Sequence, residues 1–66
     1  MTNKPGIIYT GHGYEACLTR SGILAVTRNG KGKYMTGPEA IQWAEHISTA
    51  IDTKEAAALC RAIYNS

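Results

Sequence analysis

The pair Asn29-Gly30 is the feature that most constrains the fold of this chain. It separates a run of apolar and β-branched residues, Ile23 to Arg28, from a second run, Lys31 to Met35. A two-residue type I′ turn needs a positive φ at both central residues, which Asn tolerates and Gly adopts freely. The pair therefore predicts a tight hairpin. Lys31, Gly32 and Lys33 in its second strand are typical of an edge strand that charge protects against further pairing.

Two further strands are expected before this hairpin. Gly6 to Thr10 is a short β-branched and aromatic run, which is typical of a strand. Tyr14 to Thr19 alternates large or apolar residues with more polar ones, as a half-buried strand requires. Gly11-His12-Gly13 joins the two runs and predicts a turn.

The connection from Thr19 to Ile23 is compatible with two registers. A two-residue loop, Ser21-Gly22, would place Leu18 on the same face as Ala25. A three-residue loop with Gly22 in the left-handed conformation instead gives one continuous apolar face. That face would hold Ala16, Leu18, Leu24 and Val26. We favour the second register because it gathers the apolar side chains.

Two helices are expected after the sheet. Thr36-Gly37-Pro38-Glu39 has the spacing of a capping box with proline in the first turn, and predicts a helix from about Gly37 to Ile51. Asp52-Thr53-Lys54-Glu55 repeats the pattern and predicts a second helix from about Thr53 to Tyr64. On a helical wheel the apolar side of the first helix holds Ala40, Ile41, Trp43, Ala44, Ile47, Ala50 and Ile51. That of the second holds Ala56, Leu59, Cys60 and Ile63.

The chain has 66 residues and is expected to form a single domain, residues 1–66. The predicted fold class is α+β, a three- or four-stranded antiparallel meander (6–35) followed by two helices (37–51 and 53–64) packed on one face. A domain of this size buries only roughly 60% of the surface of its unfolded chain, which disfavours a deep catalytic cleft. No apolar run reaches the ~20 residues that span a bilayer, and Met1 to Pro5 lacks a signal-peptide core. We therefore expect a cytoplasmic protein with no membrane partner.

Several residues are of types found in cofactor, metal or catalytic sites, but their spacing does not fit such sites. Gly11 to Ala16 fits G-x-G-x-x-A, but strand formers follow where a dinucleotide-binding fold needs a helix. His12, Cys17, His46 and Cys60 lack the close ligand pair of a zinc site. We expect two buried thiols and two surface histidines, with a disulfide as the alternative for the thiols. The sequence predicts no cofactor, no metal and no catalytic residues, hence no enzyme.

Charge is unequally distributed along the chain. Residues 1–36 have a net charge of +4, contributed by five basic residues and Glu15, whereas residues 37–66 have a net charge of −2. The basic residues in the first half include Lys4, Arg20, Arg28, Lys31 and Lys33. Clustered cations and the tyrosines Tyr9, Tyr14 and Tyr34 favour contact with an acidic surface, or with bases and phosphates. The candidate partner-binding residues are Arg20, Arg28, Asn29, Lys31, Lys33 and Tyr34.

In size and layout the chain resembles small proteins encoded by bacteriophages and other mobile elements, including anti-CRISPR proteins. The likeness covers the sheet from Gly6 to Met35, the helix start at Thr36-Gly37-Pro38-Glu39 and the two helices. It implies a phage protein that acts as an inhibitor by covering a surface of a host complex in the host cytoplasm.

We accordingly expect a non-enzymatic binding protein whose basic hairpin blocks a protein or nucleoprotein complex, such as a CRISPR effector, at an acidic or nucleic-acid-binding surface. The alternative is a nucleic-acid-binding module that uses the basic, tyrosine-bearing sheet directly. Trp43 is expected in the core, but a partly exposed tryptophan there would instead favour an interface, including one between two copies of the chain.

Overall fold

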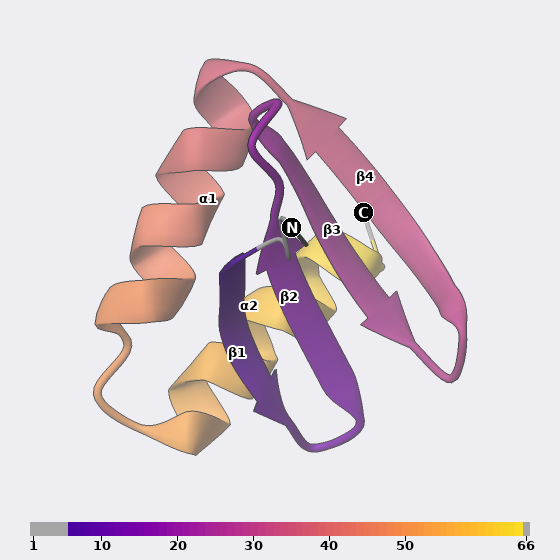
Figure 1. Ribbon diagram of the computed structural model, residues 1–66. Coiled ribbons are helices and arrows are strands. Elements are labelled where there is room, and N and C mark those ends of the chain that lie inside the picture. Colours follow the sequence, from indigo (N-terminus) through magenta and orange to yellow (C-terminus); the bar gives the residue numbers. More distant parts are fainter. Residues whose placement is uncertain (1–5, 66) are drawn as a thin grey trace.

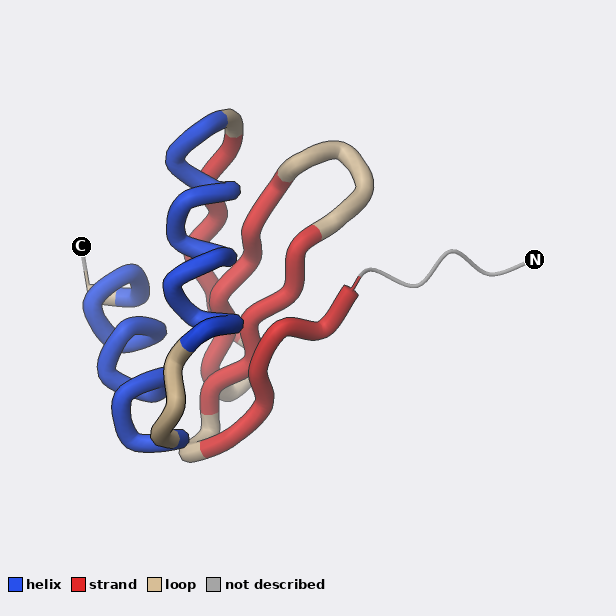
Figure 2. Tube along the Cα trace, turned by 90° about the vertical axis from the view of Figure 1, so that its left-hand side faces the viewer, coloured by secondary structure: helices blue, strands red, loops and turns tan. Residues whose placement is uncertain are grey.

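The computed structural model describes residues 6–65 as a four-stranded antiparallel sheet followed by two helices (Figure 1). The strands are β1 (Gly6–Gly11), β2 (Tyr14–Leu18), β3 (Ile23–Arg28) and β4 (Lys31–Thr36), and they lie in this order in the sheet. The helices are α1 (Pro38–Thr49) and α2 (Thr53–Tyr64), and both lie on the same side of the sheet (Figure 2). The predicted α+β meander is confirmed, with four strands. Lys4 lies outside the described residues.

The strand pairing confirms the predicted register. Ala16 lies opposite Val26 and Leu18 opposite Leu24, and Gly22 has a φ of 79°. Asn29 and Gly30 have φ values of 54° and 81°, as a type I′ turn requires. His12 and Gly13 have nearly the same values, 50° and 80°. The sheet therefore has two tight turns of one type, both at the end opposite the β2–β3 loop (Figure 1).

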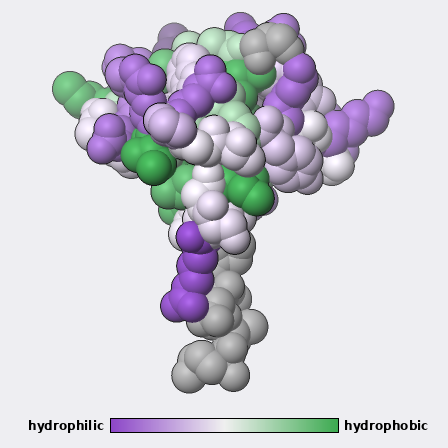
Figure 3. Space-filling view, turned by 90° about the horizontal axis from the view of Figure 1, so that it is seen from above, coloured by the Kyte–Doolittle hydropathy of each residue, from purple (hydrophilic) through white to green (hydrophobic). Residues whose placement is uncertain are grey.

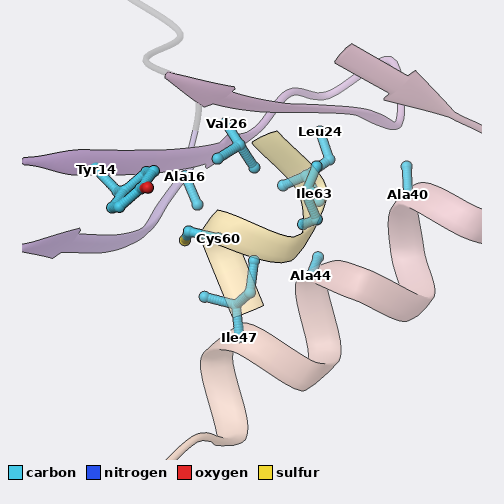
Figure 4. Close-up of a cluster of buried hydrophobic side chains, with 9 residues drawn as sticks. All are labelled: Tyr14, Ala16, Leu24, Val26, Ala40, Ala44, Ile47, Cys60 and Ile63. Atoms are coloured by element: carbon cyan, nitrogen blue, oxygen red, sulfur yellow. The ribbon is translucent and has the colours of Figure 1, made fainter. Parts of the chain in front are cut away.

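The core lies between the sheet and the helices. β2 and β3 contribute Tyr14, Ala16, Leu24 and Val26, which point toward the buried side chains of both helices (Figure 4). The helices contribute Ala40, Ala44, Ile47, Cys60 and Ile63. The alanines allow the helix backbones to approach the sheet closely, so a chain this short still encloses a continuous apolar layer.

The start of α1 differs from the predicted capping box. Thr36 pairs with Ile23 as the last residue of β4, so its backbone is extended and it does not cap the helix. Gly37 is the N-cap, with a φ of 75° and no side-chain hydrogen bond to the helix. A strand that ends directly before a helix must turn sharply, and the positive φ of this turn suits glycine.

The end of α1 also differs from the prediction, because the helix stops at Thr49 and not at Ile51. The Thr49 hydroxyl donates to the carbonyl of Glu45 at 2.8 Å, and the Ser48 hydroxyl donates to the same carbonyl at 3.1 Å. Such bonds compete with the helical ladder. Ile51 is 98% exposed in the linker, and Ile41 is also exposed, so neither belongs to the buried side of the helix.

The second helix begins and ends as predicted. The Asp52 carboxylate accepts from the backbone N–H of Lys54 at 3.0 Å and caps α2. Cys60 and Ile63 are fully buried, whereas Leu59 is half-buried. Each helix has 12 residues, and neither helix in residues 6–65 has the length and apolar character needed to cross a membrane.

Candidate functional site

The β3–β4 hairpin holds five of the six candidate residues, and Arg20 lies away from them. Arg28, Asn29, Lys31, Lys33 and Tyr34 all belong to this hairpin. Arg20 lies in the β2–β3 loop, at the other end of β3, which is about 20 Å away for a six-residue strand. Figure 3 views the molecule from the end with the β2–β3 loop and shows hydrophobic patches between hydrophilic side chains there, not one continuous hydrophilic surface. The structure therefore does not bring Arg20 together with the other candidates.

The hairpin divides its candidates between the two faces of the sheet. Lys33 lies opposite Val26 and shares its face, which is the face that the helices cover. Tyr34 lies opposite Ala25 on the other face and is 71% exposed. Cations and aromatic rings on opposite faces cannot contact the same stretch of a single-stranded nucleic acid.

Arg28 is held by a tyrosine of the core. Its guanidinium carbon lies 5.0 Å from the centre of the Tyr14 ring, and its Nη1 donates to the Tyr14 hydroxyl at 3.3 Å. Tyr14 is buried and makes an edge-to-face contact with Tyr64, with ring centres 6.0 Å apart. Tyr14 is thus a core residue that positions Arg28, and its ring is not open for stacking on a base.

The turn end of the molecule holds a basic hollow that the sequence interpretation missed. It has a volume of about 320 Å³ and is lined by His12, Lys54, Ala57, Ala58 and Arg61. Arg28 does not line the hollow but lies next to the same turn, because the Arg28 Nε lies 3.7 Å from the position that a Cβ on Gly13 would occupy. We call His12, Arg28, Lys31, Lys54 and Arg61 the turn-end surface.

The net charges of the two halves of the sequence do not reveal this surface, because Lys54 and Arg61 lie in the half with a net negative charge. Their i, i+7 spacing puts them on one side of α2, and this spacing is the sequence pattern from which the basic side of α2 could have been predicted. What the sequence could not show is that α2 passes beneath the β1–β2 turn and brings these cations to His12.

The outer edge of β4 lies beside a second hollow. This hollow has a volume of about 390 Å³ and lies between β4, the start of α1 and the end of α2. Its lining residues are Lys33, Tyr34, Met35, Glu39, Trp43, Ala62 and Ile63. Trp43 is half-buried and also borders a third hollow of about 320 Å³ with His46 and Leu59. Trp43 therefore meets the core and the surface at once, which is the arrangement expected for an interface residue.

The sheet face away from the helices has an apolar row across its four strands. Ile7, Cys17, Ala25 and Tyr34 lie side by side in the register of the sheet. Ile7 is 64% exposed, and Cys17 and Ala25 are half-buried. This row is the second surface that the sequence interpretation did not identify, although the alternation of each strand implied it.

The thiols and histidines are dispersed. Cys17 and Cys60 are both free thiols, but only Cys60 is buried in the core as expected; Cys17 is half-buried on the open face of the sheet, so the prediction of two buried thiols is wrong for it. Burial raises the pKa of both thiols, which keeps them protonated and weakly nucleophilic at neutral pH. Among residues 6–65, no three His, Cys, Asp or Glu side chains gather as metal ligands would.

Comparison of the chain with protein-family models, with curated proteins and with solved structures gives no match.

Proposed function

We propose that the chain is a non-enzymatic binding protein that covers an acidic surface of a larger protein or nucleoprotein complex with its turn-end surface. The observation that carries the proposal is the approach of basic side chains from three parts of the chain. Lys54 and Arg61 of α2 line one hollow with His12 of the β1–β2 turn, and Arg28 of the β3–β4 hairpin lies beside Gly13 of that turn, with Lys31 opposite it in the sheet. Clustered cations of this kind steer association with an acidic partner and fix its orientation.

Charge elsewhere on the helical layer supports this orientation. The segment of α1, Pro38 to Thr49, contains Glu39 and Glu45 and neither lysine nor arginine. An approaching acidic surface is therefore repelled by α1 and attracted by the turn end. The small size and the sheet-then-helices layout favour an inhibitory role of the phage type, in which a small domain blocks a host complex such as a CRISPR effector by occupying one of its surfaces.

Direct nucleic-acid binding is the weaker alternative. Phosphates would suit the turn-end surface, but single-strand binders also stack bases on exposed aromatic rings beside their cations. Here Tyr14 is buried, and Tyr34 is exposed on the opposite face from Lys31 and Lys33. A protein partner is therefore favoured.

The test compares two charge reversals by titration against an acidic peptide, ten glutamates long, and against oligo(dT) of equal length. We expect the acidic peptide to perturb the amide resonances of His12, Lys54 and Arg61. Arg61→Glu should weaken binding about tenfold or more, and Arg20→Glu, which changes the net charge by the same amount at the other end of β3, should leave it within about twofold.

Equal loss in both variants would contradict the proposal, because it would show that net charge alone drives binding. Tighter binding of oligo(dT) than of the acidic peptide, with a steep salt dependence, would establish the nucleic-acid alternative in its place.

A further inference from the structure

We propose that the outer edge of β4 binds an extended segment of the partner protein as a fifth strand of the sheet. The segment has an acidic side chain opposite Lys33 and an apolar side chain opposite Met35. This inference rests on the proposed binding function and adds the form of the partner and the place of contact.

The backbone of β4 is regular enough to accept such a strand. Its six residues pair with β3 without a register shift, from Arg28–Lys31 to Ile23–Thr36. Next to a two-residue turn the flanking pair is hydrogen-bonded, and hydrogen-bonded pairs then alternate along the ladder. The N–H and C=O groups of Gly32, Tyr34 and Thr36 therefore point away from β3. No strand in residues 6–65 lies beyond them.

Side chains of a fifth strand would enter the hollow under this edge. Lys33 and Met35 lie on the helix side of β4 and line the hollow of about 390 Å³, together with Trp43 of α1. Residues directly opposite Lys33 and Met35 on an added strand project to the same side. The partner strand thus gains backbone hydrogen bonds from the edge and side-chain selectivity from the hollow, which is the mode of β-strand addition.

Charge selects the occupant and its direction. Lys33 attracts a carboxylate directly opposite it, whereas Glu39, in the first turn of α1 just after β4 ends, disfavours one near that end of the strand. In the antiparallel pairing, which is the more stable one, the partner sequence is then apolar–x–acidic. A second copy of this chain fits poorly, because β4 paired with β4 would bring the lysines at positions 31 and 33 of both copies together on one face.

The experiment measures hydrogen exchange of the backbone amides of the full chain with a blocked heptapeptide, Thr-Thr-Leu-Thr-Glu-Thr-Thr, and with the matched peptide that has lysine in place of glutamate. We expect the first peptide to slow exchange at Gly32, Tyr34 and Thr36 and to leave Lys31, Lys33 and Met35 unchanged, since these are already bonded to β3. The lysine peptide should bind about tenfold more weakly.

Two variants test the backbone contribution. Tyr34→Pro removes an N–H that points away from β3, so the sheet tolerates it while the fifth strand loses a donor. Tyr34→Thr keeps the N–H and serves as its control. We expect binding to be lost in the proline variant and retained in the threonine variant. If the proline variant is unfolded, the exchange pattern of the unmodified chain decides by itself.

Each outcome has one meaning. Peptide-induced changes confined to His12, Lys54 and Arg61 would overturn the fifth-strand inference and leave the proposed function standing. Protection of the β4 amides that grows with protein concentration, without peptide, would identify a second copy as the occupant and also overturn it. Slowed β4 exchange that survives Arg61→Glu would support the edge site even if the turn-end surface proves idle.

Discussion

The two edges of the sheet, β1 and β4, resist further pairing by different means. The β1 register shifts between Ile7 and Tyr9, so the edge is bulged. The Tyr9 hydroxyl also donates to the carbonyl of Thr53 at 3.1 Å and ties the strand to the start of α2. β4 has no register shift and relies on the charge of Lys31 and Lys33.

The two kinds of protection differ in which added strands they exclude. A bulge and a hydrogen bond to a helix deter every added strand, because they distort the ladder itself. Lysines deter only strands that are apolar or basic, and they favour an acidic one. An edge protected by charge is thus closed to aggregation and open to a partner of opposite charge. The following variants and pH changes test this contrast between β1 and β4.

Proline at neighbouring positions of β4 should have opposite consequences. Lys33→Pro removes an N–H that is bonded to β3 and should lower the free energy of unfolding by about 3 kcal/mol or more. Tyr34→Pro removes an outward N–H and should cost about 1 kcal/mol or less. Urea denaturation of both variants measures the difference. Similar losses in the two would show that the alternation assigned to this edge is wrong.

Gly32 of β4 should tolerate alanine less well than Gly11 of β1. A Cβ on Gly32 would lie 2.6 Å from Cγ2 of Thr27 and 2.9 Å from the backbone carbonyl oxygen of Val26. Because a backbone atom yields little, Gly32→Ala should cost about 2 kcal/mol. The nearest atom to a Cβ on Gly11 is the Tyr9 hydroxyl oxygen at 2.7 Å, at the far end of a side chain that can move. Thermal unfolding should rank the two variants in this order.

Removing the Tyr9 hydroxyl should lower the free energy of unfolding more than removing the whole side chain of Tyr34. Tyr9→Phe removes the bond to the Thr53 carbonyl and should cost about 1 kcal/mol. Tyr34→Ala changes an exposed side chain and should stay within about 0.5 kcal/mol. Chemical denaturation measures both. A larger loss for Tyr34→Ala would mean that the open face of the sheet is packed against something in solution.

Alkaline pH should lower the free energy of unfolding through Tyr9 of β1 and Cys60 of α2, by less than the substitutions above. Burial raises the pKa of Cys60, and burial together with the neighbouring Cys60 raises the pKa of Tyr9. Both groups hold their protons more tightly in the folded chain than in the unfolded one. Their contribution to stability is therefore complete below about pH 9, near the ordinary thiol pKa, and is lost as the pH rises above it.

The measurement is the free energy of unfolding between pH 7 and pH 11, with Tyr9→Phe, Cys60→Ala as the comparison. The double variant should show a flatter decline above pH 9. An equally steep decline would assign the loss to other groups.

Much of the fold followed from local patterns. The Asn29-Gly30 turn, the strand register around Gly22 and the Asp52 cap of α2 each depend on a few adjacent residues, and the structure confirms all three. The capping box at Thr36 failed because that residue is held in the sheet by Ile23, a partner 13 positions earlier. Competition between a local cap and a distant strand pair cannot be weighed without the pairing.

The candidate site was only partly predictable for the same reason. That β3 and β4 form a basic hairpin could be predicted from their residues alone, because turn type and alternation are local properties. Which side of that hairpin the helices cover depends on the tertiary structure. The helices cover the face that holds Lys33, leave Tyr34 on the other face, and bring Lys54 and Arg61 to His12. Burial of the apolar face fixes where the helices lie, and their placement depends on the whole core and not on any one segment.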